Sequence, residues 1–160
     1  PFSFFTRNPR GGRAKAIDTE DIRALLALMR ENSFAPLLAH ALHYTTNACS
    51  ADSKMRDFAR MVMTEDLQLL ELLPGTRYNF HPGSHVKQGA EQGIIMIAEL
   101  LNEILRPQQQ TMVLLETMLV KAVKLGETLR NCVRLSTEWS CRENWGYVWI
   151  PVMFLTAAMI

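Results

Sequence analysis

Apolar residues recur every three or four positions along most of this chain, and this spacing is the feature that most constrains its fold. The clearest case has four residues at i, i+3, i+4 and i+7: Ile22, Leu25, Leu26 and Met29. Such residues share one face of a helix. No stretch of useful length alternates between apolar and polar residues, as a half-buried strand would. We therefore expect an all-α fold, with five or six helices in one compact domain, arranged as a bundle or an orthogonal array.

Capping residues and helix breakers set the expected boundaries. The first helix begins near Asp18-Thr19, where acidic residues favour the positive end of the helix dipole. A later helix begins at Ser50 or Ser53 and ends before Pro74-Gly75. The expected helices cover about residues 18–32, 34–46, 50–73, 86–105 and 108–135, and a short one follows Pro151. Residues 74–85 are expected to form the one long internal loop, because two Pro-Gly pairs favour turns.

The distribution of charge divides the chain into two parts. The chain has 17 basic and 16 acidic residues, and residues 1–16 hold four of the basic ones and none of the acidic ones. That segment contains Pro9 and the pair Gly11-Gly12, which do not support a helix. We expect a flexible basic arm at 1–16 and a helical domain at 17–160. The 48% hydrophobic content supplies a core and argues against global disorder.

The basic arm supplies the first candidate binding residues: Arg7, Arg10, Arg13 and Lys15. Flexible cations neutralise phosphates, so these residues are candidates for contact with nucleic acid or an acidic membrane surface. The aromatic residues Phe2, Phe4 and Phe5 in front of them also suit a membrane-surface anchor. A partner protein and a solvated tail remain open as alternatives.

Apolar residues on more than one side of the expected helices indicate self-association. Met61 and Met63 are two positions apart and cannot both face inward easily on one helix. Tryptophan and tyrosine are common at protein interfaces, and the C-terminal part is rich in both. The candidate interface residues are Met61, Met63, Trp139, Trp145, Tyr147 and Trp149. We expect a homo-oligomer.

Histidines and cysteines give a weaker pattern. His40 and His43 share a helix face if the second helix is correct, and His81 and His85 lie four apart. With Cys49 these residues offer zinc ligands, but their spacing matches no standard zinc pattern. We therefore expect no metal site, no cofactor and no catalytic residue. A ligand site in the Pro74–His85 loop is the alternative, with four residues that supply its polar groups: Arg77, Tyr78, His81 and His85.

These observations favour a non-enzymatic interaction or structural protein, such as a capsid- or nucleocapsid-like subunit, an effector or an adaptor. Its basic arm would contact a phosphate-bearing or protein partner. The alternatives are a small enzyme or ligand-binding protein with a site in the loop above, and a peripheral membrane protein. We expect an intracellular location, in the cytoplasm or a host cytosol, because no secretory layout is visible at the start. The longest uncharged apolar run, Gly146 to Ile160, has 15 residues and is too short to span a membrane.

Overall fold

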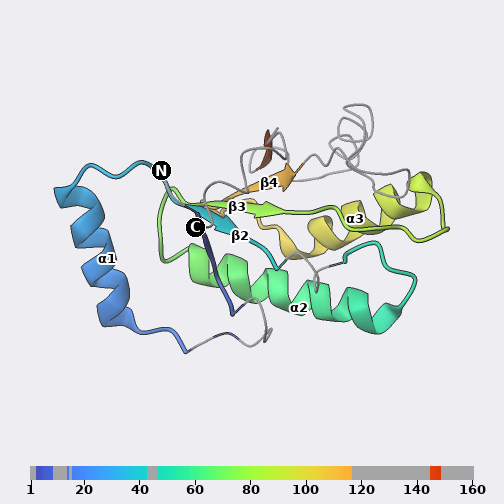
Figure 1. Cartoon of the computed structure of the whole chain (residues 1–160), viewed down its shortest axis with the longest axis horizontal. Coiled ribbons are helices and arrows are strands. Elements are labelled where there is room, and N and C mark those ends of the chain that lie inside the picture. The colour runs from blue at the N-terminus through green and yellow to red at the C-terminus, as the bar shows by residue number, and fades with distance from the viewer. Residues whose placement is uncertain (1–2, 9–13, 15, 43–46, 117–144, 149–160) are drawn as a thin grey trace.

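The computed structural model describes residues 3–8, 14, 16–42, 47–116 and 145–148 (Figure 1). Strands and helices alternate along them, so the expected all-α fold is wrong and the fold is α/β. The elements are β1 (Ser3–Phe5), α1 (Thr19–Glu31), β2 (Leu38–His40), α2 (Ser53–Leu70), β3 (Arg77–Phe80), α3 (Ala90–Ile104), β4 (Met112–Glu116) and β5 (Trp145–Val148).

The five strands form one parallel sheet in the order β1-β2-β3-β4-β5. Each strand pairs with the next strand in the sequence, and Phe5, His40, Asn79 and Leu114 lie at the same level of the sheet. Because parallel neighbours need a crossover connection, the helices are the links between successive strands. In Figure 1, α2 and α3 lie along one side of the strands. This order brings the carboxyl ends of all the strands to one edge of the sheet.

The two faces of the sheet carry different side chains. Alternate strand residues pack against α2 and α3 to form the main core: Ala39, Tyr78, Phe80, Val113 and Leu115. The helices contribute residues that are spaced by three or four, such as Met63, Leu67 and Leu70. Strand residues alternate between faces. His40, Asn79 and Leu114 therefore lie on the opposite face, away from the helices.

The three described helices were predicted from their apolar spacing and are confirmed. Asp18 caps α1, and its Oδ1 accepts a hydrogen bond from the Glu20 amide at 2.9 Å. Asp52, and not Ser50 or Ser53, caps α2 by accepting from the Lys54 amide at 2.9 Å. No helix in the part of the chain that the structure describes is both long enough and apolar enough to cross a membrane.

The strands were all missed. The expected helix at 34–46 contains β2, the expected loop at 74–85 contains β3, and the expected helix at 108–135 begins with β4. Strand β1 lies within the segment expected to be a flexible arm, and β5 lies in the aromatic C-terminal part. These strands have three to five residues. Short buried parallel strands show no alternation that their sequence could reveal.

Candidate metal centre

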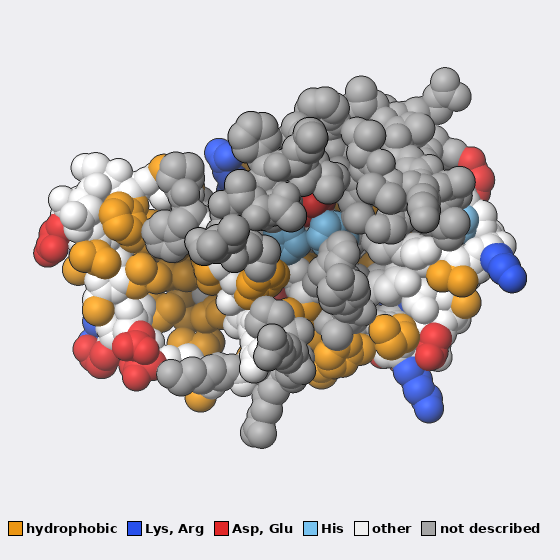
Figure 2. Space-filling model, viewed as in Figure 1, with side chains coloured by type: hydrophobic (Ala, Val, Ile, Leu, Met, Phe, Trp, Pro, Cys, Tyr) orange, Lys and Arg blue, Asp and Glu red, His pale blue; other side chains and the backbone are white. Residues whose placement is uncertain are grey.

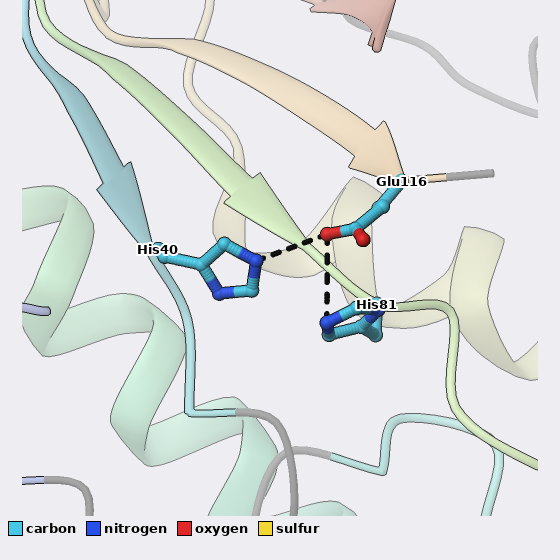
Figure 3. A group of neighbouring side chains, drawn as sticks. All are labelled: His40, His81 and Glu116. Atoms are coloured by element: carbon cyan, nitrogen blue, oxygen red, sulfur yellow. Dashed lines mark hydrogen bonds and ion pairs between the residues drawn. The ribbon is translucent and has the colours of Figure 1, made fainter. Parts of the chain in front are cut away.

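Three side chains from three strands meet at the carboxyl edge of the sheet. His40 is the last residue of β2, His81 directly follows β3, and Glu116 is the last residue of β4. Figure 3 shows the two imidazole rings turned toward the carboxylate. The Nε2 atom of His40 lies 2.9 Å from Oε2 of Glu116, and the Nε2 atom of His81 lies 3.4 Å from the same oxygen. Histidine side chains come to the surface near the middle of the face that Figure 2 shows.

The donor set and its geometry fit a zinc ion. Ligand atoms ~2.0–2.1 Å from a tetrahedral zinc are about 3.3 Å apart. The distances of 2.9 and 3.4 Å in the cluster are close to that value, and all three ligand atoms lie within 4.8 Å of one another. Two histidines and a carboxylate leave a coordination position for water or substrate, as in catalytic zinc sites. The three residues are 4–9% exposed, which limits competition from bulk water.

Neighbouring groups orient the three ligands. Nδ1 of His40 lies 2.8 Å from the carbonyl oxygen of Ala41, so it carries the proton and donates to that oxygen. This contact directs Nε2 of His40 toward the centre, as backbone carbonyls do for many metal-binding histidines. The side-chain amide of Asn79 donates to Oε2 of Glu116 at 2.7 Å. The rings of His40 and His81 lie 5.0 Å apart, and the ring of Phe5 lies 5.6 Å from that of His40.

The contacts within the cluster favour the ionised carboxylate. Burial alone raises the pKa of Glu116, but hydrogen bonds from His40 and Asn79 and the charge of His81 lower it below its usual value. Burial alone lowers the pKa of His40, but the contacts with Glu116 and Ala41 raise it above its usual value. The cluster therefore holds a negative charge that attracts a cation, whether a proton on His40 or a metal ion.

The segment that follows β3 is held by one asparagine. Oδ1 of Asn47 accepts hydrogen bonds from the amides of Ser84 at 3.2 Å and Cys49 at 3.3 Å, and its Nδ2 donates to the carbonyl of Ser84 at 3.0 Å. Gly83 has a φ of +84°, and a Cβ there would lie 2.2 Å from Asn47 Oδ1. Asn47 and Gly83 therefore fix the turn that begins at His81.

The residues expected in the basic arm do not form one exposed group. Arg7 is buried and pairs with Glu65 and Asp66, so its guanidinium is committed to the interior. Arg10, Arg13 and Lys15 lie outside the described residues, and their contact with phosphate stays a prediction.

The candidate interface residues are also divided. Met63 is buried in the core, whereas Met61 on the same helix is 45% exposed. Trp145 and Tyr147 lie in β5. Trp139 and Trp149 lie outside the described residues, and the interface stays a prediction.

Of the four residues in the alternative ligand site, only His81 belongs to the cluster. Arg77 is exposed at the start of β3, and Tyr78 faces α2 and donates to Asp66. Nδ1 of His85 accepts a hydrogen bond from the Gly89 amide. His43 lies outside the described residues, and burial raises the pKa of the Cys49 thiol to about 12, which makes it a poor metal ligand.

Sequence reasoning missed Glu116, and it named His40 and His81 among five possible zinc ligands but predicted no metal site. A signal was present, because a histidine or glutamate follows each of three short, largely apolar segments: Leu37-Leu38-Ala39-His40, Tyr78-Asn79-Phe80-His81 and Val113-Leu114-Leu115-Glu116. The three polar residues are 41 and 35 residues apart. These separations are typical of successive β-α units, and the carboxyl ends of their strands meet at one edge.

A site at the carboxyl ends of consecutive parallel strands is where β/α-barrel enzymes carry their active residues. The chain belongs to the family described as Xylose isomerase-like TIM barrel, which matches residues 2–151. It is 51% identical over 145 residues to a protein of Akkermansia muciniphila named "Probable endonuclease 4", covering 91% of this chain and 52% of that protein. A protein of Clostridium beijerinckii with the same name is 55% identical over 127 residues, covering 79% of this chain and 46% of the relative.

Two solved structures share the fold. Endonuclease IV from Thermus thermophilus superimposes with a TM-score of 0.71 at 23% identity, covering 86% of this chain and 49% of that one. A D-tagatose 3-epimerase-like protein superimposes with a TM-score of 0.63 at 15% identity, covering 91% and 54%. The chain spans about half the length of the curated relatives that it matches.

These relatives contradict the expected function. The chain resembles proteins named as endonucleases, not capsid subunits, effectors or adaptors. The expectation of a non-enzymatic structural or interaction protein is therefore wrong. The alternative of a small enzyme is closer, and its loop contains His81 of the cluster.

Proposed function

We propose that this chain carries a metal centre of an endonuclease 4-type enzyme, an AP endonuclease that acts on DNA in repair. The observation that carries the proposal is the convergence of His40, His81 and Glu116 at the carboxyl edge of the sheet. The names of the most similar relatives support it. An enzyme of this kind works where DNA is, so we propose an intracellular location.

Cleavage of a phosphodiester bond requires an activated water molecule and groups that stabilise negative charge on the phosphate. A zinc ion, when bound, lowers the pKa of its water and neutralises charge on the phosphate. In this chain His40, His81 and Glu116 would hold the ion, because Nε2 of both histidines and Oε2 of Glu116 face one another. Ala41 fixes the tautomer of His40, and the buried position of all three residues excludes most other water.

Binding of the negatively charged DNA backbone requires positively charged side chains next to this centre. Phe5, the last residue of β1, pairs with His40, so β1 ends at the edge that carries the cluster. The chain that follows β1 contains Arg10, Arg13 and Lys15. We propose that these three residues contact DNA phosphates.

The test uses the 160-residue chain and two duplex oligonucleotides, one with a single abasic site and one without it. It measures the cleavage of each duplex. We expect the native chain to nick only the abasic duplex, and only when zinc is supplied. Glu116→Gln and His81→Asn each remove a ligand and should lower the rate by about 100-fold or more. Arg23→Ala is the control, because Arg23 is 73% exposed on α1 and pairs only with Glu20 among the ion pairs of the described residues.

Zinc binding is measured on the same samples by calorimetry. A native chain that binds no zinc would contradict the metal centre. A native chain that binds zinc but leaves the abasic duplex intact would contradict the assignment of nuclease activity to this chain.

A further inference from the structure

Asn79 lies beside the metal ligands and is completely buried. Its position in β3 pairs with His40, and His81 lies two residues further on, so all three side chains share one face of the sheet. Its Nδ2 donates a hydrogen bond of 2.7 Å to Oε2 of Glu116. An ionised carboxylate only accepts hydrogen bonds, so the amide nitrogen must be the atom that faces it. The orientation of the amide is therefore fixed.

The other end of this amide is the unusual feature. Oδ1 of Asn79 is buried and has no hydrogen-bond partner among the residues that the structure describes. A buried acceptor without a partner is unfavourable, because it loses its contact with water and gains nothing in return. A β-branched apolar residue would suit a buried strand position better. Stability of the strand therefore gives no reason for asparagine at this position.

We propose that Asn79 is a positioning residue of the metal centre. Its amide N–H holds the carboxylate of Glu116 in the orientation that would bind the ion, and the unsatisfied Oδ1 is the cost of that contact. This inference rests on the metal centre proposed above. Contacts of this kind to metal ligands commonly change metal affinity by ~10–100-fold.

Thr76, just before β3, supplies a matched control. It is 2% exposed, and its Oγ1 also has no hydrogen-bond partner within the described part of the chain. Asn79→Val and Thr76→Val both introduce valine. Each removes a buried polar side chain that has one atom without a hydrogen-bond partner in the described part of the chain. Of these two residues, only Asn79 contacts Glu116, so only the substitution of Asn79 should affect the metal centre.

The experiment measures the Kd for Zn²⁺ of the full chain by competition with a chromogenic chelator, and the Tm of the same proteins without zinc. We expect Asn79→Val to weaken zinc binding by ~10–100-fold while its zinc-free Tm stays within a few degrees of the native value. Thr76→Val should leave the affinity unchanged, and its Tm should be unchanged or higher. Asn79→Ala should repeat the affinity loss if valine does not fit the site.

The possible results separate the two proposals. Native zinc affinity in both Asn79 variants would overturn the positioning role and leave the metal centre intact. An equal affinity loss in Thr76→Val would also overturn it, because the cause would then be strand packing. A native chain that does not bind zinc would overturn the metal centre itself, and the role of Asn79 with it.

Discussion

Nε of Arg7 donates a hydrogen bond of 2.9 Å to Oδ1 of Asp66, and the two side chains are only 2% and 1% exposed. Tyr78 donates to the other oxygen of the same carboxylate at 2.8 Å, and Arg7 also pairs with Glu65 at 2.7 Å. This network joins the segment after β1 to α2 and β3. Strand β1 and Arg7 are therefore part of the folded body.

Loss of Arg7 should destabilise the protein strongly. Arg7→Ala leaves Asp66 buried with a charge and without its cationic partner, and breaking a buried pair in this way costs about 3–5 kcal/mol. Urea unfolding followed by circular dichroism measures the loss. Arg23→Ala is the comparison, because the pair of Arg23 with Glu20 is 73% and 76% exposed and is worth less than ~0.5 kcal/mol. Similar effects of the two substitutions would contradict the buried network.

Gly83 should not tolerate a side chain. Gly83→Ala combines a φ of +84° with a Cβ that would lie 2.2 Å from Oδ1 of Asn47, so both backbone strain and displacement of Asn47 oppose it. We expect a loss of about 2–3 kcal/mol in the free energy of unfolding, together with weaker zinc binding through His81. Gly75→Ala has a similar φ of +81° but no atom within 4 Å, and should cost ~1 kcal/mol with no change in zinc affinity. Equal zinc affinities for the two variants would show that the turn does not position His81.

The contact between His40 and Glu116 should make the zinc-free protein more stable at mildly acidic pH. In the folded protein the pKa of His40 is raised above 6.5. The stabilisation from protonated His40 is therefore fully present below about pH 6.5 and is lost as the pH rises through that raised pKa. In the folded protein the pKa of Glu116 is lowered below 4.5. The stabilisation from ionised Glu116 is therefore present above pH 4.5 and is lost as the pH falls through that lowered pKa. The Tm difference between the native chain and His40→Gln, measured in EDTA, should be largest at about pH 5–6 and smaller at ~pH 8.5. A difference that grows toward alkaline pH would contradict the pair.

Zinc binding should have the opposite dependence on pH. A metal ion needs His40 without its second proton, so the proton that stabilises the zinc-free pair competes with the ion. Zinc affinity should therefore rise with pH up to the raised pKa of His40 and then level off. Calorimetry in buffers with different ionisation enthalpies measures the protons released. No proton release below ~pH 6 would contradict binding through His40.

Self-association remains a prediction, and the structure suggests how to test it. Phe5 and Met112 are 39% and 37% exposed on the sheet face opposite the helices, and Met61 is 45% exposed on α2. We expect the chain to be at least dimeric at micromolar concentration by light scattering, with little effect of salt. Met112→Lys should weaken the dimer by about tenfold, because it places a charge at an exposed apolar position of the sheet face opposite the helices. Met61→Lys tests the helix surface separately, and a monomeric native chain would contradict the prediction.

The helices could be predicted from the sequence because each has a local signal. In α1, Asp18 caps the first turn and Ile22, Leu25 and Leu26 share the face that packs against the core. The apolar face of α2 repeats at threes and fours in the same way. The spacing of apolar residues and the capping residues depend only on neighbours in the sequence, so a single sequence is enough to find these helices.

The sheet and the site depend on residues far apart in the sequence. Leu38-Ala39-His40 has only three residues, and the pattern around it also fits a helix. Glu116 gives no local sign of its role, because its partners are His40 and His81, 76 and 35 residues away. His40 was placed with His43 on one expected helix, and the wider group with His81, His85 and Cys49 was set aside because its spacing matches no standard zinc pattern. The error about the site followed from the error about the sheet.

A zinc ion on His40, His81 and Glu116 would act as a removable cross-link between three strand ends. It would close two loops, because the three residues are 41 and 35 positions apart. The unfolded chain would have to give up much of its freedom to keep these ligands together, so the ion would favour the assembled sheet. Chelation would release β2, β3 and β4 from one another at the edge where DNA is proposed to bind. Resistance of this sheet to proteolysis would then depend on the supply of zinc.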